Sequence, residues 1–375
     1  MKVLFDALGL PSYGGARTSA LGWIRSVVEA GAQHEFVVLV SNHEPALQSM
    51  GNLEQVEVRN LNRFGVRVWI QMHLPRIVRA RGIDVVHFTK NLGCVLVPCP
   101  TVITINDLNR LHYPKMFSRV DVLYWKTVQR AVLRDVDQVI AISESTRQDL
   151  VRFYRLQPEK IRVIYPAVDS QFHHQPLTTK GASTVLEKYG IRTPYILSVG
   201  GMAAHKNVYT ALIAFCSKRE RGFLSDHAFV VVGERIHTHN DPRLFDVAAR
   251  DSFGRVCFTG VVADVDLPTI YANASLFVYP SLYEGFGIAP LEAMSCGVPV
   301  LASRNGSLPE VLGEAAWLVD DPTDVDAMGE GMLQILTDST VWEGLKKRGL
   351  ENARRFSWSR TAQQTLTVFG QLVGG

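Results

Sequence analysis

Glu284 and Glu292 stand eight positions apart and flank a stretch that contains two glycines, Gly285 and Gly287. The stretch follows the apolar run 276–279, which predicts a buried parallel strand. Main-chain N–H groups have no partner at a helix start, and glycines let an anion such as a diphosphate approach them. A carboxylate beside an anion is suited to hydroxyl groups, such as those of a sugar. Residues 283–294 therefore indicate a site for a ligand that carries both groups.

The composition limits the size and class of the protein that carries this site. The chain has 375 residues, 47% of them apolar, which is enough for two buried cores. A net charge of +3 and the lack of a recognition motif give no reason to expect a nucleic-acid partner. The chain enters a strand pattern at once and has no apolar run of the roughly 20 residues that span a membrane, so we expect a cytoplasmic protein. An odd number of cysteines without paired spacing argues against disulfides or a zinc site: Cys94, Cys99, Cys216, Cys257 and Cys296.

Strand-like and helix-like stretches alternate along the whole chain, which predicts an α/β fold with parallel sheets covered on both faces. In the first half the predicted strands are residues 3–7, 36–40, 56–61, 85–88, 102–106, 139–142 and 161–165. In the second half they are residues 195–200, 229–232, 256–259, 276–279, 298–302 and 316–319.

Between the two series the pattern lapses into polar, proline and glycine residues at 169–193, which indicates a domain boundary. We therefore predict two Rossmann-like, doubly wound domains that face each other across a cleft. They would cover residues 1–170, for acceptor binding, and 171–355, for donor binding. Ligands of such sheets bind beyond the carboxyl ends of the strands.

Several motifs resemble those of the family 4 glycosyltransferases. In the second half these are residues 280–287, 290–294, 296–300 and 308–311; looser matches follow at 104–107, 143–145 and 165–169. The resemblance implies the GT-B fold, a retaining mechanism and a nucleotide-sugar donor. In GT-B proteins a C-terminal helix, here within 356–375, returns to the first domain.

The resemblance also implies roles around the two carboxylates. Glu284 would bind the transferred sugar's hydroxyls, and Glu292 the nucleotide ribose. The main-chain amides that would hold the diphosphate belong to Gly285, Phe286, Gly287 and Ile288. The plain alternative is that Glu292 faces solvent and that Glu284 only caps the helix.

Lys206 precedes an apolar-periodic helix and follows the predicted strand 195–200, so it would lie at the sheet edge with Gly200 and Gly201 beside the donor. A cation there can neutralise the diphosphate as the glycosidic bond breaks. The alternative is an ordinary solvated lysine. The family often has an arginine where this chain has Gly201 or His205, so a phosphate role for His205 is left open.

The predicted first domain would form the other side of the predicted cleft, facing the donor site. The resemblance places Gly14 and Gly15 against the diphosphate, although a plain tight turn is the alternative. Asn106 stands where the family commonly has a histidine; it can hydrogen-bond a sugar and act near the reaction centre, but it cannot relay a proton. Asp107 and Arg17 are candidate acceptor contacts, and each is as well explained by a structural role.

The basic stretch 59–81 has no acidic residue and carries apolar residues at helical spacing. Such a stretch can rest on anionic lipid. A half-buried helix is the interpretation that we favour, because the spacing fits one apolar face turned to a core. Peripheral contact with the inner membrane is left open.

The function expected from these features is transfer of a hexose from a nucleotide sugar to a saccharide or lipid-linked saccharide acceptor in polysaccharide biosynthesis. GDP-mannose is the first choice of donor. No metal or other cofactor is expected, because Lys206 and the helix amides would supply the positive field. The alternatives are a nucleotide-sugar epimerase of the same architecture and a non-catalytic, nucleotide-sugar-binding partner of another transferase.

Overall fold

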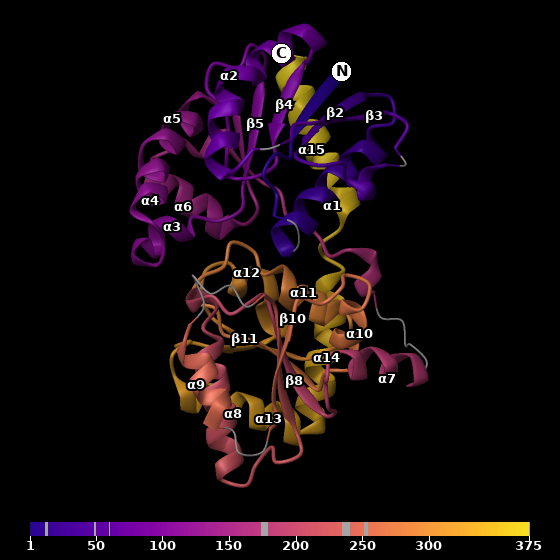
Figure 1. Ribbon diagram of the computed structural model, residues 1–375, viewed down its shortest axis with the longest axis vertical. Coiled ribbons are helices and arrows are strands. Elements are labelled where there is room, and N and C mark those ends of the chain that lie inside the picture. The colour runs from indigo at the N-terminus through magenta and orange to yellow at the C-terminus, as the bar shows by residue number, and fades with distance from the viewer. Residues whose placement is uncertain are drawn as a thin grey trace. The chain divides into compact units, whose positions relative to one another are not determined.

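A computed structural model describes residues 1–374 except 12–13, 49, 60, 174–178, 235–240 and 251–253. Part of the predicted boundary, at 174–178, therefore lies outside the described residues. The chain forms two compact units (Figure 1). One comprises Met1–Ala167 with Phe356–Gly375, and the other comprises Val168–Arg355.

The first unit contains a parallel sheet with the strand order β3-β2-β1-β4-β5-β6-β7. Its strands are β1 (Lys2–Asp6), β2 (Glu35–Val40), β3 (Leu53–Glu57), β4 (Val85–Phe88), β5 (Thr101–Ile105), β6 (Gln138–Ala141) and β7 (Ile161–Val163). The order reverses between β1 and β4, so their carboxyl ends form a topological switch point.

Strand β3 differs most from the prediction of 56–61, because its register with β2 pairs Leu53 with Phe36 and Glu57 with Val40. Pairing with β2 thus sets the bounds of β3, whereas the apolar pattern alone suggested a later start. The last predicted positions of this strand include residue 60, which lies outside the described residues.

Helices flank this first sheet. They are α1 (Gly15–Ala30), α2 (Arg63–Arg81), α3 (Asn109–His112), α4 (Arg119–Lys126), α5 (Val128–Asp135), α6 (Glu144–Tyr154) and α15 (Trp358–Val373). Short 3₁₀ helices occur at Pro45–Leu47, Pro114–Met116 and Pro158–Lys160.

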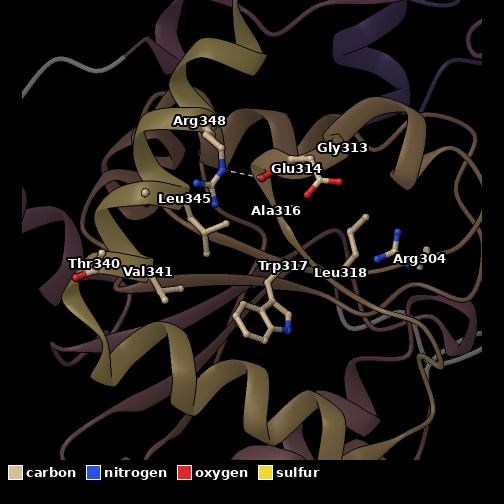
Figure 2. A pocket seen from close by; sticks show the side chains of 11 residues that line it. Arg304, Gly313, Glu314, Ala316, Trp317, Leu318, Thr340, Val341, Leu345 and Arg348 are labelled. Atoms are coloured by element: carbon tan, nitrogen blue, oxygen red, sulfur yellow. Dashed lines mark hydrogen bonds between the residues drawn. The ribbon is translucent and has the colours of Figure 1, made fainter.

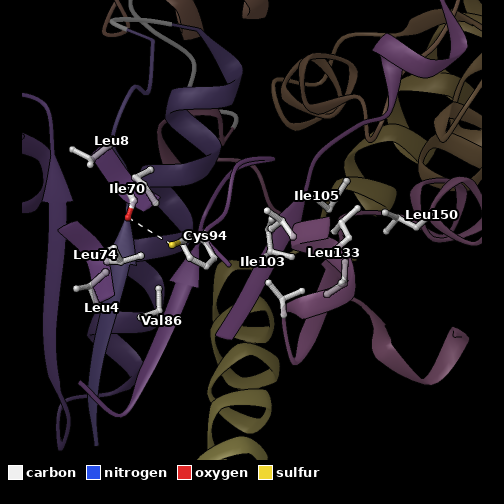
Figure 3. Packing of buried hydrophobic residues seen from close by; sticks show 14 of the residues in the cluster. Leu4, Leu8, Ile70, Leu74, Val86, Cys94, Ile103, Ile105, Leu133 and Leu150 are labelled. Carbon is white, nitrogen blue, oxygen red and sulfur yellow. Dashed lines mark hydrogen bonds between the residues drawn. The ribbon is translucent and has the colours of Figure 1, made fainter. Parts of the chain in front are cut away.

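The core of the first unit lies between the sheet and its helices (Figure 3). Ile70 and Leu74 of α2 are fully buried there, and the Cys94 thiol lies 3.6 Å from the Ile70 carbonyl oxygen. Arg67, on the same helix, forms an ion pair with Asp121 at 3.0 Å. The apolar face of the basic stretch is thus turned to the core, which confirms the half-buried helix.

The C-terminal helix α15 packs against α1 within the first unit (Figure 1). Trp23 Nε1 donates a hydrogen bond to Thr365 Oγ1 at 3.0 Å. Gly22 permits this close approach, because a Cβ atom at that position would lie 2.6 Å from the Trp358 ring. The last turns of the chain therefore complete the first unit's core.

The second unit contains a parallel sheet with the order β10-β9-β8-β11-β12-β13. Its strands are β8 (Tyr195–Val199), β9 (Ala228–Val232), β10 (Val256–Gly260), β11 (Leu276–Tyr279), β12 (Val300–Ser303) and β13 (Trp317–Val319). The order reverses between β8 and β11, so the second switch point lies at the ends of these two strands.

Helices cover this sheet as well, with α8 packed against α13 and α11 against α14. The α-helices are α7 (Thr179–Lys188), α8 (Val208–Glu220), α9 (Arg243–Arg250), α10 (Leu267–Ala272), α11 (Ile288–Ser295), α12 (Leu308–Leu312), α13 (Val325–Thr337) and α14 (Ser339–Ala353). The 3₁₀ helices are Ser170–Phe172, Ala204–Lys206 and Gly313–Ala315. No helix in the described ranges has both the length and the apolar content to cross a membrane.

Candidate active site

A lysine and a glutamate meet at the switch point of the second sheet. Lys206 ends the 3₁₀ helix after β8, and its Nζ donates a hydrogen bond to Glu284 Oε1 at 2.6 Å. The same Nζ donates to the Tyr279 hydroxyl at 3.1 Å, and Ser281 Oγ donates to Glu284 Oε1 at 2.7 Å. The lysine side chain is 19% exposed and the glutamate 13%. Strand β11 and the two loops beside it therefore assemble a largely buried charge pair.

Burial and pairing act in opposite directions on these two groups. Burial alone would raise the pKa of Glu284, but the adjacent Lys206 ammonium outweighs it and holds that pKa below its usual value. Burial alone would lower the pKa of Lys206, but the Glu284 carboxylate outweighs it and raises that pKa. Burial, followed by the same carboxylate, raises the pKa of the Tyr279 hydroxyl. The pair is therefore charged at neutral pH while Tyr279 remains a neutral phenol.

The loop that carries Glu284 is held in place from behind. Both the N–H and the Oγ of Ser307 donate to the Glu284 carbonyl oxygen at 3.1 Å. Gly306 has φ +58°, and a Cβ atom there would lie 2.5 Å from the same oxygen. On the other side, the Leu282 N–H donates to the His205 carbonyl at 2.8 Å and so joins the glutamate and lysine loops. These contacts fix the backbone on both sides of the pair.

Sequence reasoning gave no role to Tyr279, Ser281, Gly306 or Ser307. Ser281 lies inside the motif 280–287, and the pair Gly306-Ser307 directly precedes the motif 308–311. Motif position could have drawn attention to Ser281 and Ser307. The contact with Tyr279 depends on the strand's register and has no local signature.

The glycines predicted beside the donor have conformations or contacts that suit them to tight loops. Gly287 has φ +94° and directly precedes α11. Gly200 and Gly201 have φ +125° and +88°, and both N–H groups donate to the Val232 carbonyl. A Cβ atom on Gly200 would lie 3.7 Å from the Tyr279 ring and 4.0 Å from Lys206 Cε, so this turn lies directly against the charge pair.

Glu292 lies on α11 and is only 7% exposed. The Tyr271 hydroxyl donates to its Oε2 at 2.8 Å. Burial, reinforced by the carboxylates of Asp169 and Asp264, raises the pKa of Glu292 to about 7. The plain alternative is thus wrong: Glu292 does not face solvent, and Gly287 rather than Glu284 precedes the helix without a side-chain cap.

The candidate residues of the first unit lie at the start of α1 and just after β5. Gly14, with φ +95°, precedes α1, and Gly15 is that helix's first residue. The Arg17 guanidinium forms an ion pair with Glu44, with both carboxylate oxygens at 2.6 Å. The Asn109 N–H donates to Asp107 Oδ1 at 2.9 Å, which gives Asp107 a local structural contact.

Asn106 follows β5, and its N–H donates to Asn91 Oδ1 at 2.7 Å. This bond ties the end of β5 to the loop after β4. The predicted residues of this unit thus lie in two places, at the start of α1 and after the end of β5.

A pocket of about 480 Å³ lies elsewhere on the second unit, beside the edge strand β13 (Figure 2). Arg304, Trp317, Leu345 and Arg348 are among its lining residues, and Arg348 Nε donates to the Glu314 carbonyl at 2.8 Å. It includes none of the predicted site residues, so we take the charge pair and not this pocket as the chemical centre. Within the described ranges, no three His, Cys, Asp or Glu side chains are grouped to hold a metal ion.

Two family models match successive parts of the chain. Residues 13–172 match the model described as Glycosyltransferase Family 4, and residues 193–338 match the model described as Glycosyl transferases group 1. The chain is 34% identical over 274 residues to the O-antigen chain mannosyltransferase B of Escherichia coli, a match that covers 72% of this chain and 69% of that protein.

A second relative is the serotype-specific mannosyltransferase WbdA of Escherichia coli. It is 31% identical over 242 residues, and the match covers 63% of this chain but only 29% of WbdA. The matched part of the chain therefore corresponds to less than a third of that longer protein.

Solved structures share the whole architecture. Anabaena HepE in complex with UDP and glucose has a TM-score of 0.79 at 19% identity, and the match covers 99% of this chain and 100% of HepE. WaaG, a glycosyltransferase involved in lipopolysaccharide biosynthesis, has a TM-score of 0.75 at 18% identity and is covered fully, as is this chain. These likenesses show the fold, which is GT-B, and the sequence matches show the family: this chain is a glycosyltransferase and belongs to the family that the two models describe.

Proposed function

We propose that this chain is a cytoplasmic, retaining hexosyltransferase that moves mannose from GDP-mannose to a saccharide or lipid-linked saccharide in polysaccharide assembly. The observation that carries the proposal is the buried Lys206–Glu284 pair at the switch point of the second sheet. The choice of mannose is supported by the two relatives that are named mannosyltransferases.

The charge pair suits a ligand that has hydroxyls beside a diphosphate. Glu284 Oε1 already accepts from Lys206 and Ser281, and the ionised carboxylate has a second acceptor oxygen, Oε2. That second oxygen would accept hydrogen bonds from hydroxyls of the transferred sugar. A charge-assisted bond of this kind is about twice as strong as a neutral one.

The positive groups would act on the leaving group. As the bond from the anomeric carbon to the diphosphate breaks, negative charge grows on the diphosphate oxygens. Lys206, and the amides of Gly285, Phe286, Gly287 and Ile288 at the start of α11, would stabilise that charge more in the transition state than in the ground state. We propose that this field serves without a metal ion. Glu292 would accept the ribose hydroxyls beside Tyr271.

No protein base is required in the mechanism that we propose. The acceptor hydroxyl oxygen bonds to the anomeric carbon on the face that the diphosphate leaves, and its proton passes to a diphosphate oxygen. Asn106 would hold a sugar hydroxyl by donating and accepting hydrogen bonds, a role that needs no proton transfer.

One assay tests the proposal. The purified protein is incubated with GDP-mannose, UDP-glucose and other nucleotide sugars, with and without mannose oligosaccharides or lipid-linked saccharides. The released nucleotide is measured, and the anomeric configuration of the product is read by NMR. We expect acceptor-dependent release from GDP-mannose and an α-linked product. Release from another donor only, or a product of inverted configuration, would contradict it.

A further inference from the structure

The first unit also has a lysine and a carboxylate at its switch point, and no role has been assigned to either. Asp6 is the last residue of β1, and Lys90 follows β4 by two positions. Thr89 Oγ1 donates to the Asp6 carbonyl at 2.7 Å and thereby joins the two strand ends. The side chains interact electrostatically, since each affects the other's ionisation.

The two charged groups are buried and incompletely bonded. Asp6 is 0% exposed, and its Oδ1 accepts from the Leu8 N–H at 3.0 Å. Neither Asp6 Oδ2 nor Lys90 Nζ, both shielded from solvent, has a hydrogen-bond partner among the residues that the structure describes. Burial raises the pKa of Asp6 and lowers that of Lys90, with the other charge opposing in each case. Unsatisfied buried polar atoms are rare and destabilising, so an explanation is needed.

The loop between β1 and α1 passes directly beside the ammonium. Gly9, an exposed residue with φ +69°, lies in the loop between β1 and α1, and a Cβ atom there would lie 3.3 Å from Lys90 Nζ. Because residue 9 is a glycine, no side chain from this position lies over the Lys90 ammonium. Lys90 itself is only half-buried as a residue, so its flexible stem already reaches the surface.

The two unused atoms have complementary hydrogen-bonding capacities. Lys90 Nζ can only donate, and an ionised Asp6 Oδ2 can only accept. A phosphate would be attracted to the lysine but repelled by the carboxylate beside it. A hydroxyl group can accept from the first atom and donate to the second, so a neutral polyhydroxylated ligand fits the pair better than an anion.

We propose that Asp6 and Lys90 form an acceptor subsite that binds hydroxyl groups of a saccharide, with the Lys90 side chain turning outward past Gly9 to meet it. The inference rests on the proposed function in that a transferase needs a second, saccharide substrate. The adjacent loop supports the location, because Asn91 accepts the Asn106 N–H and so connects the subsite to the residue proposed to hold a sugar hydroxyl.

The variant Lys90→Met tests the subsite, with Lys160→Met as the matched control. Lys160 belongs to the same unit but immediately precedes the edge strand β7, whereas Lys90 follows the central strand β4, and the Lys160 Nζ donates to the Arg134 carbonyl at 2.7 Å. Transfer from GDP-mannose to α-mannobiose is measured together with saturation-transfer NMR of α-mannobiose binding. We expect Lys90→Met to raise the KM for mannobiose by about tenfold or more, as for a lost bond to a charged group. The KM for GDP-mannose and the rate of its hydrolysis without acceptor should be unchanged, as should every value for the control.

The double variant Asp6→Asn/Lys90→Met separates binding from folding. Because it removes two buried charges together, it should melt no lower than the wild type while it still loses affinity for mannobiose. Unchanged mannobiose KM and binding in the folded variants would overturn the subsite, as would the absence of mannobiose binding by the wild type. If the wild type binds mannobiose but transfers nothing from any nucleotide sugar, the proposed function fails, and loss of NMR binding in Lys90→Met would still support the subsite.

Discussion

Lys206 with Glu284 and Lys90 with Asp6 occupy corresponding places in the two units, at the strand ends where the order of each parallel sheet reverses. In the second unit the two groups are joined at 2.6 Å, and Glu284 keeps a lowered pKa. In the first unit Lys90 Nζ donates no hydrogen bond to the described residues, and the pKa of Asp6 is raised. In the second unit the lysine and the carboxylate are thus already paired before a ligand binds. In the first unit the Lys90 ammonium and Asp6 Oδ2 have no hydrogen-bonding partner among the described residues.

The largest effect should come from removing the carboxylate of the joined pair. We expect Glu284→Ala to fold and to lose at least about 10³-fold in kcat/KM, because both the sugar contact and the partner of Lys206 are gone. Steady-state transfer from GDP-mannose measures the loss. Glu330→Gln is the matched control, since Glu330 pairs with the buried Lys218 between α13 and α8. Ordinary turnover by Glu284→Ala would show that the pair is only structural.

Removal of the lysine should have the next largest effect. Lys206→Ala is expected to reduce kcat by about 10²-fold, which corresponds to the roughly 3 kcal/mol of one lost electrostatic contact to a transition state. Only the Ser281 hydrogen bond and His205 would then oppose the effect of burial on Glu284, so its pKa should rise above the wild-type value and residual activity should need a higher pH. A pH–rate profile of the variant checks both effects. A profile that coincides with the wild type's would argue against the coupling.

The backbone contacts that hold the Glu284 loop can be tested without changing Lys206 or Glu284. In Gly306→Ala the new Cβ atom would lie 2.5 Å from the Glu284 carbonyl oxygen, so the loop must shift, and a shift of about 1 Å can reduce turnover by about 10²-fold. Gly313→Ala is the control, because Gly313 also has positive φ, +50°, but a Cβ atom there would meet nothing within 4 Å. Both variants should lose stability in urea unfolding, and Gly306→Ala should lose more because it adds the clash to the strain of a positive φ. Equal losses of activity would mean that backbone strain alone explains the effect.

The effect expected at Glu292 is on the pH dependence of stability and not on turnover. Its pKa of about 7 exceeds the ordinary glutamate value of 4.5, so between these values the folded state holds a proton that the unfolded state has lost. Stability should therefore be highest below about pH 4.5 and fall as pH rises towards 7, by up to about 3 kcal/mol. Asp169, Asp264, the Tyr271 hydroxyl and the Cys296 thiol are the ionisable groups that act on or respond to this carboxyl.

Urea unfolding of the wild type and Glu292→Gln at pH 5 and pH 8 measures this dependence. The variant, which cannot ionise there, should have the flatter profile. A parallel slope in both proteins would place the pKa of Glu292 near its ordinary value.

The sequence predicted the fold well because the strands are short apolar runs separated by turn signals, and parallel buried strands have that pattern. Strand ends were less accurate where pairing overrode the pattern, as at β3, which begins at Leu53 because of its register with β2. The motif around Glu284 pointed to its neighbours in the chain. It could not reveal Tyr279 as a partner of Lys206, because strand register and side-chain direction create that contact.

The Asp6–Lys90 pair was invisible for a related reason. The two residues are far apart in sequence, and only the placement of β1 beside β4 brings them together. Each looked like an ordinary polar residue at a strand end. Their unsatisfied hydrogen-bonding capacity is a property of the packed structure and has no counterpart in composition or periodicity.

The most direct test of the central claim compares two ligands with and without Glu284. GDP-mannose and GDP are titrated by calorimetry into the wild type and Glu284→Ala. If Glu284 holds the transferred sugar, the substitution should weaken GDP-mannose by about tenfold or more while GDP keeps its affinity within about twofold. Equal weakening of both ligands, or of neither, would contradict the assignment of Glu284 to the sugar.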